Sequence, residues 1–308
     1  MRTPAPTPHD AEHGAASPRG HVVVGYDGSA ASGPALAYAA AQASSRGLPL
    51  RIVSAFPVVV SELGMSTGLG VDAGIIDAVR QVAQDHVDEA AEHVQSRHPQ
   101  LQISTKVAPG GAAGILLDES SVASLLVLGS RGSTSIVGRL GSTSRQVATH
   151  SRAPTVVVKD AAPSGEVVVG VDGSADSLRA VAFAFDLASR EGLPLKAVHA
   201  WDVPPIGALT GLPSPEPVAL VQDLERAETR AAMEELAGFS ARYPEVPMEP
   251  VIVRGAPVDV LVQQSAGAAM LVVGSRGHGG FLGLLLGSVS HGVLHHATCN
   301  VAVVRATA

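Results

Sequence analysis

The sequence predicts an α/β fold in which two doubly wound, parallel five-stranded sheets follow one another along the chain. The first observation is an internal repeat: "HVVVGYDGSAAS" from His21 returns as "EVVVGVDGSADS" from Glu166, 145 residues later. The second is that each copy holds short β-branched apolar runs, which are typical of strands buried on both faces. The third is that segments of helical length separate these runs, and this alternation favours a parallel sheet with helical crossovers.

Each copy is expected to contain five strands and four helices in matching order. The first helix ends at Gly47 or Gly192, each with a proline two residues beyond, and a charged amphipathic segment follows the second strand. The expected strands cover residues 22–27, 50–56, 102–108, 124–130 and 155–159 in the first copy, and 167–172, 195–201, 249–255, 269–275 and 301–305 in the second. The expected helices cover about 31–46, 75–97 and 142–150, then about 176–191, 217–242 and 288–297, with one more between the third and fourth strands of each copy.

The repeat also sets the domain organisation. Residues 1–20 lack large apolar side chains and an apolar signal core, so we expect a disordered tail rather than a secretory signal. One domain is predicted for residues 21–160 and a second for residues 166–305. The Pro/Gly/Ser linker between them, residues 161–165, is short, which favours halves that pack against each other.

Composition and charge exclude several classes of protein. The net charge is −7 and there is no long run of Lys or Arg, which argues against nucleic acid as a partner. No stretch reaches about 18 continuous apolar residues, so we expect no membrane-spanning segment. The single cysteine, Cys299, cannot form an internal disulfide, which fits a reducing cytoplasm. The sequence therefore predicts a cytoplasmic protein.

A glycine-rich stretch follows the fourth strand of each copy. It reads "VVGSRGHGGFLGLLLGSVS" from Val272 and "VLGSRGSTSIVGRLGSTS" from Val127. Ligands of doubly wound sheets bind beyond the carboxyl ends of the strands, and glycine lets a ligand approach exposed amides. Gly287 and Ser288 open a helix, whose first amides are unpaired and whose dipole favours an anion. The stretch predicts a backbone cradle for a polyphosphate; the alternative is that its glycines only form turns and close helix–strand contacts.

Three motifs together resemble the universal stress protein family in its tandem two-domain form. They are "VVVGVDGS", "LPLKAVHAWDVP" and "GSRGHGGFLGLLLGSVS…VLHHATCNVAVVR", and the resemblance covers nearly all of residues 21–305. It implies Rossmann-like, adenine nucleotide-binding domains with strand order 3-2-1-4-5. It also implies that the terminal strands, Thr155–Lys159 and Val301–Arg305, face each other and pair the two domains.

The resemblance further implies a ligand and a role. Gly274-x-x-Gly277, nine residues, then Gly287-Ser288 is the pattern of the family's ATP-binding branch. ATP is therefore the expected ligand, with Mg²⁺ held mainly by phosphates and water. Family members act mostly as regulators in stress adaptation, which implies a regulatory protein partner of unknown identity. A homodimer is a further expectation.

Site residues are carried over position by position. In the second copy they are Asp172 on the adenine and ribose side, Ala200 at the adenine, Gly274 at the ribose, and Gly277, Gly287, Ser288 and Val289 at the phosphates. In the first copy they are Asp27, Ala55, Gly129, Gly132, Gly141, Ser142 and Thr143 in the same order. Arg276 and Arg131 recur after the strand-4 glycine, where a guanidinium either contacts phosphate or pairs with a carboxylate across the domain interface.

The two copies are not equivalent. Eight residues separate Gly132 from Gly141, where the pattern requires nine. One missing residue changes the span by up to about 3.5 Å, which is enough to lose a phosphate contact. Arg139 either compensates by reaching the phosphates or is a solvated surface charge. The second site is therefore expected to bind ATP more tightly, and the first to be weaker or degenerate.

Binding is favoured over catalysis. The chain lacks a G-x-x-x-x-G-K-[ST] motif, and neither cradle contains a lysine, an in-line base or a paired-Asp metal site. The alternatives are a slow ATPase or adenylyl-transferring enzyme that uses Asp172 with a metal, and an interaction module without nucleotide. Ser29 and Ser174 lack the surroundings of a nucleophile and are expected to cap helices.

Two further groups of residues have a structural and a functional interpretation. His291, His295 and Cys299 follow one another at four-residue spacing, which places them on one helical face and permits a zinc site. The corresponding residues of the first copy are Arg145, Thr149 and Ala153, so the repeat favours packing and capping instead. Trp201 and its counterpart Phe56 are expected at the rim of the sheet.

Overall fold

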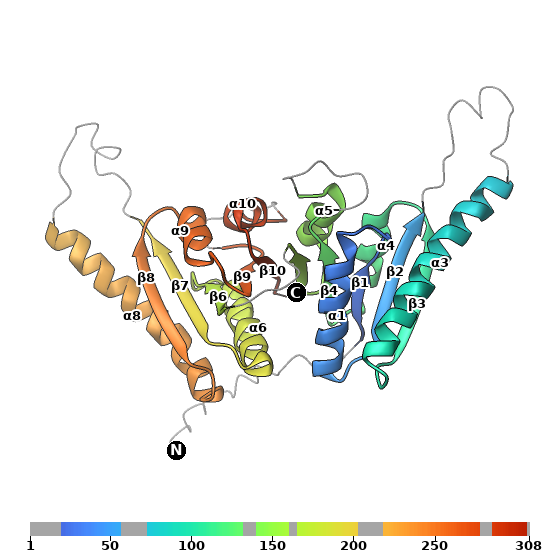
Figure 1. Ribbon diagram of the computed structural model, residues 1–308. Coiled ribbons are helices and arrows are strands. Elements are labelled where there is room, and N and C mark those ends of the chain that lie inside the picture. Colours follow the sequence, from blue (N-terminus) through green and yellow to red (C-terminus); the bar gives the residue numbers. More distant parts are fainter. Residues whose placement is uncertain are drawn as a thin grey trace, which may run out of the picture.

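The computed structural model describes residues 20–56, 73–131, 140–159, 165–202, 218–277 and 285–306. Within these residues the chain forms two α/β halves that share one sheet (Figure 1). Nearly all of the predicted tail, most of the linker and the central parts of both glycine stretches lie outside the described residues. The expectations for those segments stay predictions.

Both halves repeat the predicted order of strands and helices. The first half contains β1 (Val22–Gly25), α1 (Ser32–Arg46), β2 (Leu50–Phe56), α3 (Ala73–Arg97), β3 (Ile103–Pro109), α4 (Ala112–Glu119), β4 (Leu125–Gly129), α5 (Ser142–His150) and β5 (Thr155–Val158). The second contains β6 (Val167–Gly170), α6 (Ala175–Glu191), β7 (Leu195–Trp201), α8 (Val218–Arg242), β8 (Met248–Arg254), α9 (Pro257–Gln264), β9 (Met270–Gly274), α10 (Ser288–His296) and β10 (Asn300–Val304).

The strands form one ten-stranded sheet in the order β3-β2-β1-β4-β5-β10-β9-β6-β7-β8. Each half therefore has the predicted order 3-2-1-4-5, and its neighbouring strands are all parallel. The doubly wound α/β class is confirmed. The strand order reverses where β1 meets β4 and where β6 meets β9, so ligand sites are expected at the carboxyl ends of those strands.

The strands are buried on both faces because helices cover each side of the sheet. In β1, Val22 and Val24 pack with Ala35 of α1, whereas Val23 packs with Leu116 of α4. All three valines are fully buried. An uninterrupted β-branched run therefore forms a strand here, as expected for a parallel sheet. The small alanines of α1 let that helix lie close to the sheet.

The halves are joined by the antiparallel pairing of β5 with β10. Val157 lies opposite Val301, and Thr155 lies opposite Val303. This confirms the predicted pairing of the terminal strands. The side chain of Asn300 strengthens the same edge, since its Oδ1 accepts a hydrogen bond of 2.7 Å from the Lys159 amide.

A cation at the end of each terminal strand reaches a helix of the other half. Lys159 Nζ donates to the carbonyls of Leu294 and Ala297, both at 2.7 Å, at the C-terminus of α10. In the reverse direction, Arg305 Nη2 donates to the Thr149 carbonyl of α5 at 2.6 Å. Helix C-termini carry unpaired carbonyls and partial negative charge, so both contacts are electrostatically favourable.

Helices α1 and α6 make a second contact between the halves. The Arg46 guanidinium lies 3.0 Å from the Asp186 carboxylate. Gln42 Nε2 donates to Glu191 Oε1 at 2.6 Å. Desolvation by burial raises the pKa of Glu191. The halves are thus fixed both edge to edge along the sheet and helix to helix on one of its faces.

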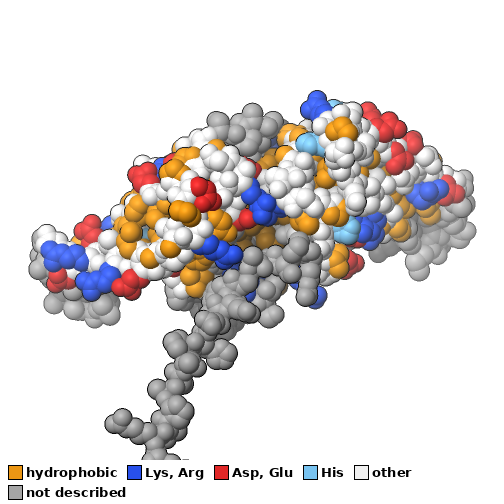
Figure 2. All heavy atoms as spheres, turned by 90° about the horizontal axis from the view of Figure 1, so that it is seen from below, with side chains coloured by type: hydrophobic (Ala, Val, Ile, Leu, Met, Phe, Trp, Pro, Cys, Tyr) orange, Lys and Arg blue, Asp and Glu red, His pale blue; other side chains and the backbone are white. Residues whose placement is uncertain are grey.

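The underside of the molecule is drawn in Figure 2. Acidic and basic side chains are interspersed on this face among apolar and other polar ones. No helix in the described part of the chain is both long and apolar enough to cross a bilayer.

Lys159→Arg is expected to remove one contribution to the pH dependence of the free energy of unfolding. Burial lowers the pKa of Lys159 from 10.5 to about 8. Between these values the unfolded chain binds more protons than the folded one, so the free energy of unfolding rises with pH across this window. Arginine stays charged throughout. Denaturant unfolding at several pH values should show wild type gaining stability relative to Lys159→Arg as pH rises from about 8 toward 10.5; parallel pH profiles would contradict the assignment.

Candidate functional site

A cavity of about 520 Å³ opens at the carboxyl ends of β6, β7 and β9 in the second half. It is enclosed by the first turn of α9 and by the start of α10. Its described lining is Gly170, Val171, Asp172, Ser177, Val198, Ala200, Pro257, Leu261, Val273, Gly274, Arg276, Gly277, Gly287, Ser288, Val289 and Ser290. One part of this wall is apolar, and the other consists of glycines, serines, one arginine and one aspartate.

The structure brings together every residue predicted for the second site. They come from four separate segments: the end of β6, the end of β7, the end of β9 and the beginning of α10. A matching cavity of about 230 Å³ in the first half is lined by Asp27, Ala55, Gly129, Arg131, Gly141, Ser142 and Thr143, among others. Gly132 and Arg139 lie outside the described residues.

Helix α10 presents its first amides to the cavity. Its N-cap is Gly287, which makes no side-chain capping bond, and the His291 amide is the first to bond back, to the Gly287 carbonyl at 3.0 Å. The amides of Ser288, Val289 and Ser290 precede that bond. The Ser290 hydroxyl is turned toward β9, where it donates to the Gly274 carbonyl at 2.7 Å. The helix start therefore offers backbone donors and a positive dipole end to an anion.

The glycines of the stretch serve different purposes. A Cβ on Gly274 would lie 2.8 Å from the Asp176 carbonyl carbon and 2.9 Å from the Ser177 nitrogen, so this glycine is required by close packing of α6 on β9. A Cβ on Gly277 would collide with the Asp172 carboxylate. A Cβ on Gly287 would meet its neighbours at ordinary distances, 3.4 Å and beyond. The packing interpretation thus explains Gly274, whereas packing does not require a glycine at Gly287.

The acidic residue just after β6, Asp172, is held in place by the turn that follows it. Asp172 Oδ1 accepts from the Ser174 amide at 3.0 Å. Ser174 is the N-cap of α6 and accepts from the Ser177 amide, as predicted. The same prediction for Ser29 is wrong. The N-cap of α1 is Ala31, and the Ser29 hydroxyl donates instead to Asp27 Oδ1 at 2.6 Å. The first half starts its helix later, so Ser29 lies too far from the first turn to cap it.

Sequence reasoning missed a polar cluster beneath the second cavity. Ser177 Oγ accepts from the Asp172 amide at 3.0 Å and donates to Glu235 Oε1 of α8 at 3.3 Å. Burial raises the pKa of Glu235, and the charge of Asp172 raises it further. Nearby, His199 Nδ1 lies 2.8 Å from the Val171 carbonyl. These groups lie next to the end of β6, at the edge of the second cavity.

The repeat itself carried a signal for this cluster. At the matching positions, 145 residues earlier, the first copy has Ser54 in place of His199 and Ala90 in place of Glu235. Glu235 is a carboxylate where the sister copy has an alanine, and His199 is a larger titratable side chain where the sister copy has a small hydroxyl, so the cluster is specific to the second half. The other ring nitrogen of His199, Nε2, lies 3.0 Å from Glu228 Oε2 of α8.

The other predicted groups lie apart from the cavity lining. The rings of His291 and His295 are 4.7 Å apart on the exposed side of α10, whereas Cys299 is buried. Among the described residues, no group of three or more His, Cys, Asp or Glu side chains is arranged to hold a metal ion. Trp201 and Phe56, 8% and 4% exposed, end β7 and β2 at the rim of the sheet, as predicted.

Both halves of the chain match a known protein family. The sequence model of the universal stress protein family matches residues 18–159 and again residues 164–305. The chain therefore belongs to the universal stress protein family, with two family domains in tandem.

Proteins of known sequence and structure support the same assignment. The chain is 35% identical to universal stress protein Rv2623 of Mycobacterium tuberculosis over 292 residues, covering 92% of this chain and 96% of that protein. It is 38% identical to universal stress protein Mb2028c of Mycobacterium bovis over 294 residues, with the same coverage. The crystal structure of a universal stress protein from Archaeoglobus fulgidus has the same fold, with a TM-score of 0.66 and 20% identity over 92% of this chain and 98% of that one.

Gly274→Ala and Gly287→Ala are expected to differ sharply in stability. The added methyl on Gly274 would enter the backbone of α6, and overpacking of this kind costs about 1–3 kcal/mol. The methyl on Gly287 has room, and its φ of −72° and ψ of 160° suit alanine, so no loss of stability is expected. Thermal unfolding of both variants tests this; equal melting temperatures would mean that Gly274 is not packed as described.

Proposed function

We propose that this protein binds ATP in the cavity of its second half and acts in the cytoplasm as a nucleotide-dependent regulator of stress adaptation. The family membership supports the link to stress. The cavity itself is the observation that supports the nucleotide assignment. It combines an apolar pocket, the acidic Asp172 just after β6 and the amides at the start of α10. These features match adenine, ribose and phosphate in turn.

The proposed binding mode uses main-chain groups for the phosphates. Adenine lies against Ala200 and the apolar wall near Val198 and Leu261, and Asp172 accepts hydrogen bonds from the ribose. The amides of Ser288 and Val289 bind the phosphate tail at the positive end of the helix dipole. Mg²⁺, if bound, takes its ligands mainly from phosphate oxygens and water. None of these roles requires bond breaking, so the proposal is one of binding.

Regulation follows if ATP favours one of two conformations. A ligand shifts an equilibrium only by its difference in affinity for the two states. The cavity lies beside the junction of the halves, because α10 contacts Lys159 of the first half at its far end. Occupancy of the site can therefore change the surface offered to a partner protein, or to a second copy of the chain.

Ser288→Pro is expected to weaken ATP binding about 10- to 100-fold, because it removes one amide donor to a charged phosphate, worth about 1.5–3 kcal/mol. Proline is tolerated at the first helical position, and Gly287 already has the extended backbone that the residue before proline adopts. Isothermal titration calorimetry measures the affinity, and fluorescence of the single tryptophan, Trp201, gives an independent signal beside Ala200.

Two controls accompany this variant. Ser288→Ala keeps the amide and removes only the hydroxyl, so its loss should be clearly smaller. Ser142→Pro makes the same change in the first half, where Gly141 also has an extended backbone, and should leave the tighter site unaffected. Wild-type affinity in Ser288→Pro would show that the α10 amides do not bind the phosphates. No ATP binding by the wild-type protein would end the proposal.

The two sites are expected to differ in affinity by about tenfold or more. The first cavity is smaller, and its glycine loop is one residue shorter. Calorimetric titration of wild type should resolve a tight and a weak phase. Asp172→Ala should abolish the tight phase and Asp27→Ala the weak one. Two equal sites, or loss of the tight phase in Asp27→Ala, would contradict this ranking.

A further inference from the structure

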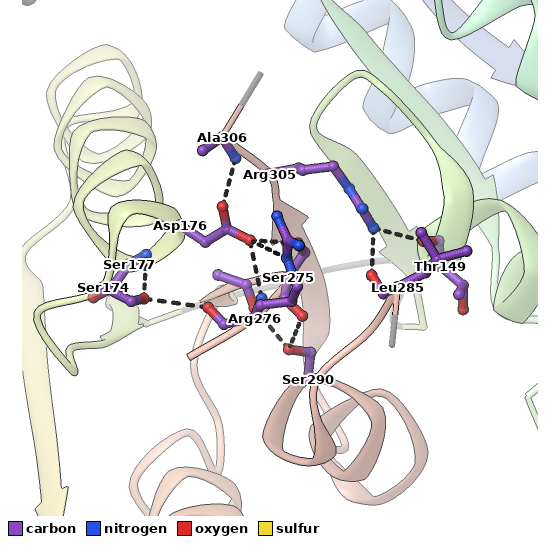
Figure 3. A network of polar contacts seen from close by, with 11 residues as sticks. Thr149, Ser174, Asp176, Ser177, Ser275, Arg276, Leu285, Ser290, Arg305 and Ala306 are labelled. Carbon is purple, nitrogen blue, oxygen red and sulfur yellow. Dashed lines mark hydrogen bonds and ion pairs between the residues drawn. The ribbon is translucent and has the colours of Figure 1, made fainter. Parts of the chain in front are cut away.

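Asp176 is a buried carboxylate beside the second cavity that the sequence patterns did not single out. It is the second residue of α6, and its side chain is 5% exposed. Oδ2 accepts from the Ser275 hydroxyl at 2.6 Å and from the Arg276 amide at 3.1 Å, while Oδ1 accepts from the Ala306 amide at 2.8 Å (Figure 3). Both oxygens are thus engaged, as a buried carboxylate requires.

Arg276 is oriented from the start of α6 at three points. Its amide donates to Asp176, its Nε lies 3.6 Å from Asp176 Oδ2, and its carbonyl accepts from the Ser174 hydroxyl at 3.2 Å. Arg276 is one of the residues that line the cavity, and its side chain is half exposed. Arginine binds phosphate through its terminal nitrogens, and the ion pair with Asp176 is made through Nε.

The charge of Asp176 also acts on a second guanidinium, that of Arg305. Burial lowers the pKa of Arg305, the charge of Arg276 lowers it further, and Asp176 opposes both effects. Asp176 pairs with Arg276, whereas the Arg305 side chain extends to the Thr149 carbonyl across the junction of the halves (Figure 3). The negative charge of Asp176 offsets part of the repulsion between the two guanidinium groups and favours the position of Arg276 beside it.

The first half lacks this arrangement. The residue that corresponds to Asp176 is Ala31, and the Ser29 hydroxyl bonds to Asp27 rather than to the backbone of Arg131. Arg131 is exposed, and no ion pair joins it to another residue in the described part of the chain. The two arginines occupy equivalent places in the repeat, and among the described residues a carboxylate pairs with Arg276 but not with Arg131.

We propose that Asp176 is a positioning residue that aims Arg276 at the terminal phosphates, so that the second site prefers a nucleoside triphosphate to a monophosphate. The inference rests on the proposed ATP site. Arginine binds phosphate with paired, charge-assisted hydrogen bonds, and a side chain already held in place loses little freedom on binding. The preference for phosphate number is thus a property of the second half.

A double-mutant cycle in the full chain tests this role. Asp176→Asn, Arg276→Gln and the double variant are titrated with ATP and with AMP by calorimetry, and their melting temperatures are recorded. Asp176→Asn keeps an oxygen acceptor and loses the charge. It should weaken ATP binding about tenfold and AMP binding less than about twofold. In the Arg276→Gln background, the same change should alter ATP binding less than about twofold.

The outcomes separate positioning from simple structural support. Equal losses for ATP and AMP in Asp176→Asn, or the same loss with and without Arg276, would overturn the proposal. If Asp176→Asn does not fold, Arg276→Gln still tests whether the guanidinium contacts the terminal phosphates. This variant leaves the hydrogen bonds of Asp176 to Ser275 and Ala306 in place. Arg276→Gln should lower the ratio of ATP to AMP affinity about tenfold at an unchanged melting temperature, and an unchanged ratio would overturn the proposal.

The test also distinguishes this inference from the proposed function. Wild-type protein that binds neither ATP nor AMP would defeat the ATP site as a whole. Wild-type protein that binds ATP, with variants that keep its preference for ATP over AMP, would defeat only the role of Asp176.

Discussion

The pairing of β5 with β10 is the constraint on which the rest of the structure depends. A five-stranded open sheet leaves a row of unpaired backbone groups at its edge, and an edge of this kind invites pairing with another strand. Here each half covers the edge of the other, so that all four residues of β5 and all five of β10 are buried. Lys159 and Arg305, at the ends of these strands, then reach the helices of the opposite half. Because the starts of α5 and α10 line the two cavities, this edge links the junction of the halves to both of them.

Most of the fold could be predicted from the sequence because local signals and the repeat agree. The valine run of β1, the alanine-rich α1 and its glycine stop, and the Gly-Ser start of α10 each carry their own signal, and each occurs twice. The second cavity was predictable for the same reason: its residues end strands or open helices, positions that a parallel sheet brings together. The misassigned cap at Ser29 shows the limit, since one helix starts later than its counterpart despite nearly identical sequence.

Contacts between segments distant in the sequence were not predictable. Nothing near Arg46 indicates that Asp186 is its partner, and nothing near Asp176 indicates that it meets the amides of Arg276 and Ala306. These contacts depend on how two halves with different side chains settle against each other. Differences between the copies carry a signal for some of them, because Asp176 replaces Ala31 and Glu235 replaces Ala90. A buried polar group tolerated in one copy alone implies partners that only this copy supplies.

The covalent joining of the halves has a consequence for how such differences arise. Because both partners of the β5–β10 edge belong to one chain, their association does not weaken on dilution, unlike that of two separate subunits. In a dimer of identical subunits, one gene sets both surfaces, and every substitution appears on each side of the symmetry axis. Here a substitution alters one side only. One half can specialise while the other keeps the pair assembled.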